Sequence, residues 1–217
     1  MPPSKKKSRA KEDSVITRYP TPFKENNLSD EKKIALIQKH FKEILTVLGL
    51  DLKDDSLANT PQRIAEMYVN EIFSGLNPKN FPDITLIEDK FTGDTSRVVT
   101  VKDIKLTSFC EHHFVPMEGI VTIAYIPNGQ LIGLSKINRI VKFFASRPQV
   151  QERLTVQIAD CLRQVLDTEH IAVFINAKHH CVSARGVNDD SSTTSTTSLA
   201  GDFQHNPVIR NEFFASL

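Results

Sequence analysis

The spacing of apolar residues changes once along the chain, and this change limits the fold. Before residue 97 the spacing is helical, and apolar residues recur every three or four positions at Ile34, Ile37, Phe41, Ile44 and Leu48. Beyond it, β-branched and alternating residues indicate strands over 97–106, 119–126 and 171–177. Two helical segments separate the strands. The order helix, helix, then β-β-α-α-β-β predicts an α+β domain whose antiparallel sheet carries helices on one face.

Local signals predict where the first two helices begin and end. Ser29 or Asp30 caps the first helix, and Gly49 ends it. Thr60 is a good N-cap for the second helix, because the proline that follows fits the first helical position. This helix is expected to end near Gly75.

The later unit has similar boundary signals. Ser135 is expected to open one helix and Pro148 the next. The segment 178–187 is expected to continue the preceding strand or to return as another. The Ser/Thr-rich stretch 189–198 suits either a loop or an edge strand.

Charge is distributed unevenly. The net charge of the 217 residues is +1, yet residues 1–11 hold five basic residues and no acidic one. A short basic tip without aromatic residues predicts a solvated end and no nucleic-acid partner. We therefore expect a disordered basic arm (1–28), an N-terminal helical region (29–96) and a catalytic domain (97–217).

Apolar runs and the cysteine count indicate in which cellular compartment the protein is expected. No apolar run reaches the length of a membrane-spanning helix, and the N-terminus lacks the apolar segment of a signal peptide, so no membrane partner is expected. The three cysteines are odd in number, which argues against a disulfide framework. A reducing, cytoplasmic location fits best.

Two short segments supply candidate metal ligands. Cys110, His112 and His113 lie in one, and His179 and Cys181 lie far downstream. Cys110, His113 and Cys181 would leave a fourth position on Zn²⁺ for water, as in catalytic sites. A fourth protein ligand, either His112 or His179, would make the site structural instead. Cys-x-x-His alone is more typical of a buried cysteine near surface histidines, and the His-His pair in each segment makes the metal site an equal alternative.

The remaining polar residues of these segments allow two interpretations. A histidine beside a metal can transfer protons near neutral pH, and His112 and His179 are the candidates. The same two residues could instead only orient the metal ligands. Glu111 is an alternative base, although a neighbour on an extended segment faces away. His180 is expected on the opposite face of its strand.

Cations near a predicted helix start suit a polyphosphate. Lys136 and Arg139 share one helix face close to backbone N–H donors, and Arg185 follows the second metal segment. The alternative is a solvated helix face. Ser135 could cap the helix or face a substrate.

Gln151 and Glu152 occupy the first turn of the next predicted helix. A carboxylate there can accept from N1–H and the exocyclic amine of guanine together. It is equally favourable to the helix dipole without any ligand.

Several ordered motifs together resemble GTP cyclohydrolase I of the bacterial type. The likeness runs from about residue 30 to the end of the chain. It is carried by Thr-Pro-Gln-Arg-Ile-Ala at 60–65, Ser-x-Cys-Glu-His-His at 108–113, Gly-Leu-Ser-Lys-Ile-Asn-Arg at 133–139, Arg-Pro-Gln-Val-Gln-Glu-Arg-Leu-Thr at 147–155 and His-x-Cys-Val-x-Ala-Arg-Gly at 179–186. The resemblance implies the tunnelling fold and a homodecamer of two pentameric rings, with active sites between subunits.

The resemblance also implies a reaction and roles. The guanine imidazole ring of GTP would be opened hydrolytically, with release of formate and formation of 7,8-dihydroneopterin triphosphate. The implied roles are Zn²⁺ binding by Cys110, His113 and Cys181, proton transfer by His112 and His179, guanine recognition by Glu152 with Gln151, a ribose contact by Ser135, and triphosphate binding by Lys136, Arg139, Arg185 and Arg63.

One residue departs from the family pattern. Glu66 stands one turn from Arg63, where several relatives carry a basic residue, and a carboxylate there would repel phosphate. Two competing functions are a related tunnelling-fold enzyme acting on a pterin or deazapurine, and a structural-zinc assembly module that binds a nucleotide.

Overall fold

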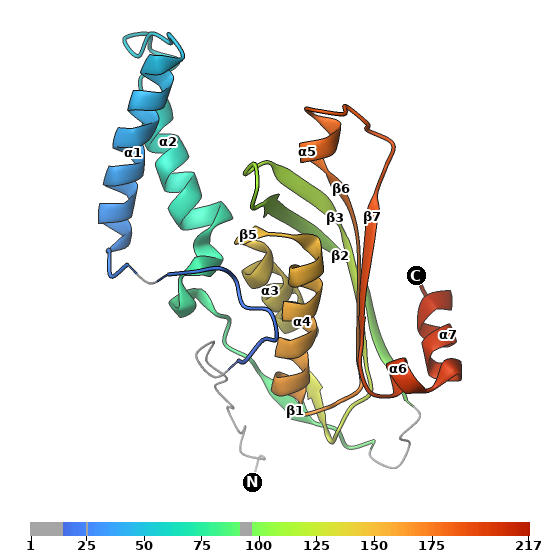
Figure 1. Ribbon diagram of the computed structural model, residues 1–217. Helices are drawn as coiled ribbons and strands as arrows, with labels where there is room; N and C mark the ends of the chain where they lie inside the picture. Colours follow the sequence, from blue (N-terminus) through green and yellow to red (C-terminus); the bar gives the residue numbers. More distant parts are fainter. Residues whose placement is uncertain (1–14, 25, 92–96) are drawn as a thin grey trace.

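In this computed structural model, residues 15–24, 26–91 and 97–217 are described. A helical hairpin lies beside a curled sheet that has two long helices on one face (Figure 1). The predicted α+β architecture and its β-β-α-α-β-β order are confirmed. The basic residues of the tip and the turn residue Gly93 lie outside the described residues. None of the described helices is long and apolar enough to span a membrane.

The hairpin consists of α1 (Asp30–Val47) and α2 (Thr60–Met67), continued by the π-helical turn η2 (Tyr68–Ile72). The Ser29 cap is confirmed, because its Oγ accepts from the Lys32 N–H at 3.3 Å. The second helix begins one residue earlier than predicted, with Asn59 rather than Thr60 at the N-cap. Two short 3₁₀ turns, η3 (Ser74–Leu76) and η4 (Pro78–Asn80), lead away from it.

The main sheet has the strand order β5-β2-β3-β6-β7. All neighbours are antiparallel except β5 and β2. A separate two-stranded sheet pairs β1 with β4. The strands are β1 (Leu86–Glu88), β2 (Val99–Cys110), β3 (Pro116–Tyr125), β4 (Gln130–Ile132), β5 (Pro148–Gln149), β6 (Ile171–His179) and β7 (Thr194–Leu199). The Ser/Thr-rich stretch therefore forms an edge strand.

Strand alternation divides the buried residues between two faces of the sheet. On one face α3 (Leu134–Ala145) and α4 (Gln151–Leu166) pack on side chains such as Val121 and Ile123, and this is the main core. On the other face, Ala124 and Ala172 pack with Phe203 and Phe213. These phenylalanines lie on α6 (Asp202–His205) and α7 (Pro207–Ala215), which the sequence reasoning missed.

Two predicted elements are wrong. Pro148 does not start a helix, because Pro148 and Gln149 pair with Phe109 and Cys110 as β5, and the helix begins at Gln151. Proline suits this first strand position because it has no N–H to donate. The segment 178–187 continues the preceding strand only as far as His179, where β6 ends, and the strand expected beyond it is wrong because the chain turns through α5 (His180–Ser183).

Residues 15–24, the described part of the N-terminal arm, contact α4. Gln164 bonds the backbone of Ile16 in both directions, accepting from its N–H at 2.9 Å and donating to its carbonyl at 2.5 Å. Arg18 donates to the buried Asp160 through its backbone N–H at 2.8 Å and its Nε at 3.0 Å. These bonds join the arm to α4.

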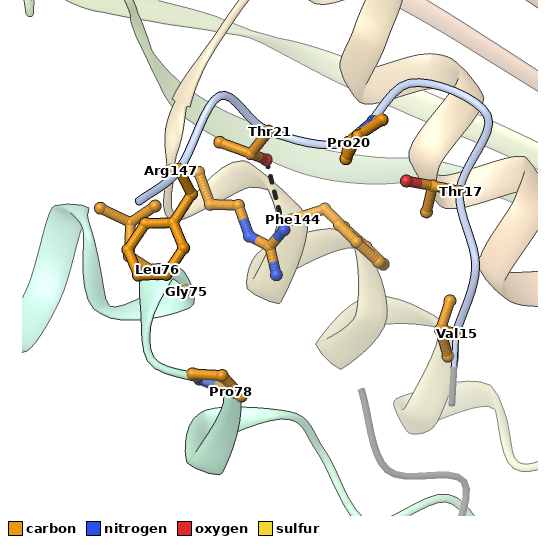
Figure 2. A pocket seen from close by; sticks show the side chains of 10 residues that line it. Val15, Thr17, Pro20, Thr21, Gly75, Leu76, Pro78, Phe144 and Arg147 are labelled. Atoms are coloured by element: carbon orange, nitrogen blue, oxygen red, sulfur yellow. Dashed lines mark hydrogen bonds between the residues drawn. The ribbon is translucent and has the colours of Figure 1, made fainter. Parts of the chain in front are cut away.

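Arg147 lines a cavity of ≈ 280 Å³ that lies between the arm, the turns η3 and η4 and the end of α3 (Figure 2). Its Nη1 donates to Thr21 Oγ1 at 3.3 Å, and its guanidinium lies 4.8 Å from the ring centre of Phe144. Gly75 faces this cavity as well, and its N–H donates to the Ser146 carbonyl at 2.8 Å. A Cβ on Gly75 would lie 2.1 Å from the Phe143 carbonyl oxygen, so only glycine allows this approach.

Candidate active site

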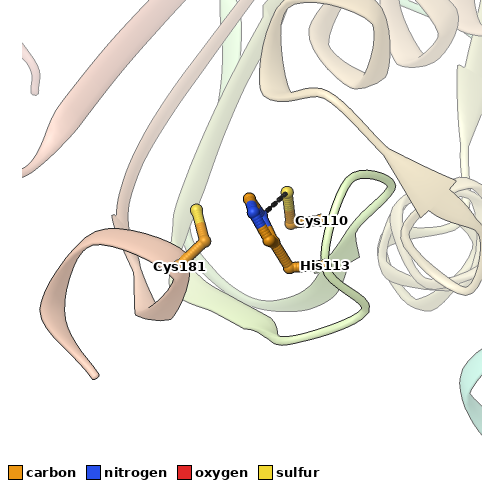
Figure 3. A group of neighbouring side chains, drawn as sticks. All are labelled: Cys110, His113 and Cys181. Carbon is orange, nitrogen blue, oxygen red and sulfur yellow. Dashed lines mark hydrogen bonds between the residues drawn. The ribbon is translucent and has the colours of Figure 1, made fainter. Parts of the chain in front are cut away.

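Three candidate metal ligands converge from two distant segments. Cys110 ends β2, His113 follows in the turn to β3, and Cys181 lies on α5. Their ligand atoms all lie within 4.8 Å of one another (Figure 3). The Cys110 Sγ is 4.0 Å from His113 Nδ1. Cys181 faces β2 because the chain forms the helical turn α5 here, where a strand was expected.

The geometry and chemistry of this group suit a metal ion. Tetrahedral Zn²⁺ with two sulfur ligands and one nitrogen ligand places those atoms about 3.5–3.8 Å apart, only slightly closer than found here. Thiolate and imidazole are also the ligand types that Zn²⁺ prefers. Among the described residues, no fourth histidine, cysteine or acidic residue joins the group. A metal held here would keep one position open, as catalytic sites do.

The turn that carries His113 has an unusual backbone. Phe114 adopts a left-handed conformation with φ +54°, which is rare for a bulky residue and is often found at functional sites. Its N–H donates to the Cys110 carbonyl at 2.8 Å, which closes the turn. The Phe114 ring packs edge-on against Phe73 at 5.0 Å and Tyr68 at 6.2 Å. The metal turn is thereby supported by the helical hairpin.

Glu111 joins the metal turn to α4. Its carboxylate accepts from both terminal nitrogens of Arg153, at 2.6 and 3.2 Å, and its N–H donates to the Gln149 carbonyl at 3.0 Å. The hydrogen bond from Arg153 holds the pKa of Glu111 below its usual value. This pairing is the geometry of a structural tie, so Glu111 is a poor candidate for a base.

The two histidines considered for proton transfer differ in their surroundings. His112 is exposed, and its Nδ1 lies 3.7 Å from Cys110 Sγ. His179 is partly buried, and its Nε2 lies 2.7 Å from Gln151 Oε1. Burial lowers the pKa of His179, while the Glu152 carboxylate raises it. His112 therefore lies beside a ligand of the metal group, whereas His179 is held by a residue of α4.

The Gln151 side chain is buried within its own chain. Its side chain is 1% exposed, and its amide nitrogen donates to the carbonyl oxygens of Ile175 and Thr194 and to Thr196 Oγ1. Its amide oxygen faces His179 Nε2 at 2.7 Å. The part expected of Gln151 in guanine recognition stays a prediction. The adjacent Glu152 remains exposed in the first turn of α4.

Arg185 lies near enough to influence the metal group. Burial raises the pKa of the Cys181 thiol, the Cys110 thiol adds to this rise, and the Arg185 guanidinium opposes it. His180 lies apart from this group, with its Nε2 3.3 Å from Glu118 Oε2. It begins α5 rather than lying on a strand as expected.

The residues expected to hold phosphate and ribose lie toward the opposite end of α3. The end beside the metal turn is Ala145, whose carbonyl accepts from Ser108 Oγ at 2.6 Å. Ser135 and Lys136 are in the first turn of this helix, about 15 Å away at 1.5 Å per residue. Arg139 is exposed between these ends. Within one chain, Ser135 and Lys136 therefore lie at the end of α3 that is remote from the metal turn.

Arg63 lies on α2, outside the sheet unit, and is exposed. Its neighbour Glu66 accepts from Gln62 Nε2 at 2.8 Å along the same helix. This bond occupies one carboxylate oxygen, and the charge that would repel phosphate remains.

The sequence reasoning missed several residues that build the site. Arg153 supports Glu111, and Thr155 and Thr196 support Gln151. The i, i+4 spacing of Gln151 and Thr155 on one helix was a usable signal. Nothing local in the sequence links either of them to Thr196.

Comparisons with known proteins agree with the site. The sequence profile of the family described as GTP cyclohydrolase I matches residues 37–217. "GTP cyclohydrolase 1" of Aliivibrio fischeri (strain MJ11) is 54% identical over 206 residues, covering 94% of each chain. The protein of the same name from Vibrio campbellii is 56% identical over 197 residues, covering 91% of this chain and 90% of its own length.

A further relative, "GTP cyclohydrolase 1" of Shewanella loihica, is 55% identical over 196 residues, covering 90% of this chain and 91% of its own length. A crystal structure of the archaeosine synthase QueF-Like in the apo form covers 48% of this chain and 93% of that chain. Its TM-score of 0.41 and identity of 15% are too low to support an argument. On the family profile and the curated relatives, the chain belongs to the GTP cyclohydrolase I family.

Proposed function

We propose that the chain hydrolyses GTP at a Zn²⁺ held by Cys110, His113 and Cys181. The observation that carries this proposal is the convergence of three ligand atoms within 4.8 Å from segments far apart in the sequence. The chemistry that bound Zn²⁺ supplies is hydroxide at neutral pH, because it lowers the pKa of a water toward ~7. The product would be 7,8-dihydroneopterin triphosphate, formed with loss of formate, on the way to folate and other pterins.

The side chains around the metal group divide the remaining tasks. Exposed Glu152 accepts from the guanine N1–H and amine, which selects guanine over adenine. His112 and His179 transfer protons on either side of the group. Arg185 adds a positive charge beside Cys181 that suits a phosphate.

We further propose that the active site is completed by a second copy of the chain. Ser135 and Lys136 lie in the first turn of α3, about 15 Å along the helix from the end beside the metal turn, which supports this proposal. A neighbouring copy would supply Ser135, Lys136 and Arg139, as it could in the homodecamer that the family resemblance implies. Arg63 would reach the triphosphate from another copy. The cytoplasmic location expected from the sequence stays a separate prediction.

One assay tests the reaction. Zinc-loaded protein is incubated with GTP, and the product is followed by oxidation to a fluorescent pterin and by release of formate. We expect both products in equal amounts, and ATP should give neither. Zinc-loaded protein without product would overturn the proposal. That result would favour the structural-zinc module. The module predicts four protein ligands, whereas three are grouped among the described residues.

A further inference from the structure

A series of buried hydrogen bonds leads from α4 to His179, and the chemistry of its groups fixes which atom donates in each bond. We propose that Gln151, Thr155 and Thr196 form a positioning unit that keeps hydrogen on Nε2 of His179 and leaves Nδ1 as the proton acceptor. This inference rests on the proposed function, because it concerns how one of the proton-transfer residues is held. It also gives the Ser/Thr-rich strand β7 a role in the site.

The direction of the chain begins on α4. Thr155 Oγ1 lies 2.8 Å from the backbone carbonyl oxygen of Gln151, one turn earlier. A carbonyl oxygen only accepts, so the single hydroxyl hydrogen of Thr155 is used in this bond. Thr155 Oγ1 is also 2.6 Å from Thr196 Oγ1. Thr196 must be the donor in that pair, because Thr155 has no second hydrogen.

The next step fixes the orientation of the Gln151 amide. Thr196 has given its hydrogen to Thr155, so its Oγ1 can only accept from the Gln151 amide, at 3.1 Å. The carbonyl oxygens of Ile175 and Thr194 lie 3.2 and 2.9 Å from the same amide atom. Three acceptors thus surround one end of the amide, and only the NH₂ group can occupy that end.

The last step reaches the imidazole. With its NH₂ group turned to the three acceptors, Gln151 presents Oε1 to His179 Nε2 at 2.7 Å. An amide oxygen cannot donate, so His179 Nε2 must carry a hydrogen. In the neutral ring the lone pair is then on Nδ1. Gln151 is only 1% exposed, and water has little access to replace this bond.

The proposal separates two neighbouring residues that sequence reasoning had grouped. Successive residues of a helix point about 100° apart, so Gln151 can face the sheet while Glu152 faces outward. Gln151 is then a positioning residue that acts through His179, and Glu152 alone reads the base. The two roles predict different kinetic effects.

The test compares two buried glutamines of α4 in the zinc-loaded protein. Gln151→Met keeps length but removes the amide, and we expect kcat to fall by about 10–100-fold while the KM for GTP changes less than about threefold. Gln157→Met is the matched control, because Gln157 is also 1% exposed but donates to Tyr19 and Thr21 of the arm. It should lower the melting temperature without changing kcat.

A spectroscopic readout does not depend on turnover. Histidine is labelled with ¹⁵N, and the His179 signals are identified by their loss in His179→Asn. We expect the Nε2–H tautomer in the parent protein and in Gln157→Met, and a mixture of tautomers in Gln151→Met. If Gln151→Met fails to fold, Thr196→Val replaces it, with Thr196→Ser expected to restore the parent behaviour.

Two results would overturn the proposal. One is that His179 keeps the Nε2–H tautomer, and the protein its parent kcat, in Gln151→Met or Thr196→Val. The other is a raised KM for GTP with unchanged kcat, which would make Gln151 a base-reading residue. Because the tautomer is measured without substrate, an inactive zinc-loaded parent protein would refute the proposed function while leaving this assignment standing.

Discussion

The two ends of α3 differ in how much of the active site a single chain has already assembled. Near its C-terminal end, the metal turn and His179 are fixed by buried hydrogen bonds, the Glu111–Arg153 ion pair and packed aromatic rings. At its N-terminal end, the side chains of Ser135 and Lys136, with Arg139 one turn later, form no hydrogen bond or ion pair with any described residue.

This difference matches the chemistry assigned to each end. A metal site and a proton-transfer residue need positions accurate to a fraction of an ångström, which a rigid sheet provides. Cations that bind a flexible triphosphate need charge and reach more than rigidity. The comparison predicts that damage at the first end is severe within each chain, whereas damage at the second can be compensated by another chain.

The largest effect is expected from removing a metal ligand. Cys181→Ser should abolish zinc retention and lower turnover by on the order of 10³-fold or more, because serine is a poor zinc ligand at neutral pH. Zinc content by elemental analysis and the pterin assay measure the two effects. Cys161→Ala is the control, since Cys161 is buried in the core. Full zinc content with normal turnover in Cys181→Ser would remove this residue from the site.

The next prediction tests whether the two ends serve one substrate from different chains. Cys181→Ser and the double variant Lys136→Ala/Arg139→Ala are each expected to have little activity. Co-assembled in equal amounts, they should recover about a quarter of the parent activity, because random mixing pairs two intact halves in that fraction of sites.

The control for this mixing experiment places both lesions in the same half. Cys181→Ser mixed with Cys110→Ser should recover nothing, since both ligands of a metal site belong to one chain. Absence of recovery in the first mixture, with assembly shown by light scattering, would mean that sites are not shared between copies.

A smaller effect is expected from loosening the metal turn without touching a ligand. Glu111→Gln weakens the bidentate bond to Arg153 and should lower zinc affinity and turnover by roughly 10-fold, as is typical for residues that orient metal ligands. Glu118→Gln is a matched control, because Glu118 is mostly exposed and its ion pair within the described part of the chain is with His180. Equal zinc affinity in both variants would contradict the proposed tie.

Local sequence signals were reliable where the local chain decides the structure. The cap at Ser29 and the end of the first helix before Gly49 depend on neighbours a few residues away, and both were predicted. The prediction that Pro148 starts a helix was wrong because distant residues decide its conformation. Its extended conformation is set by pairing with Phe109 on a strand far earlier in the sequence.

The sequence alone determined the α+β order, the three candidate metal ligands and, through its ordered motifs, the family. These follow from residue type and spacing, which a chain carries whatever its shape. The tertiary structure decided that Cys181 lies on a helical turn facing Cys110, that Gln151 is buried against His179, and that Lys136 lies at the end of α3 remote from the metal turn. Each of these depends on which segments the folded sheet brings together, and no local pattern encodes that pairing.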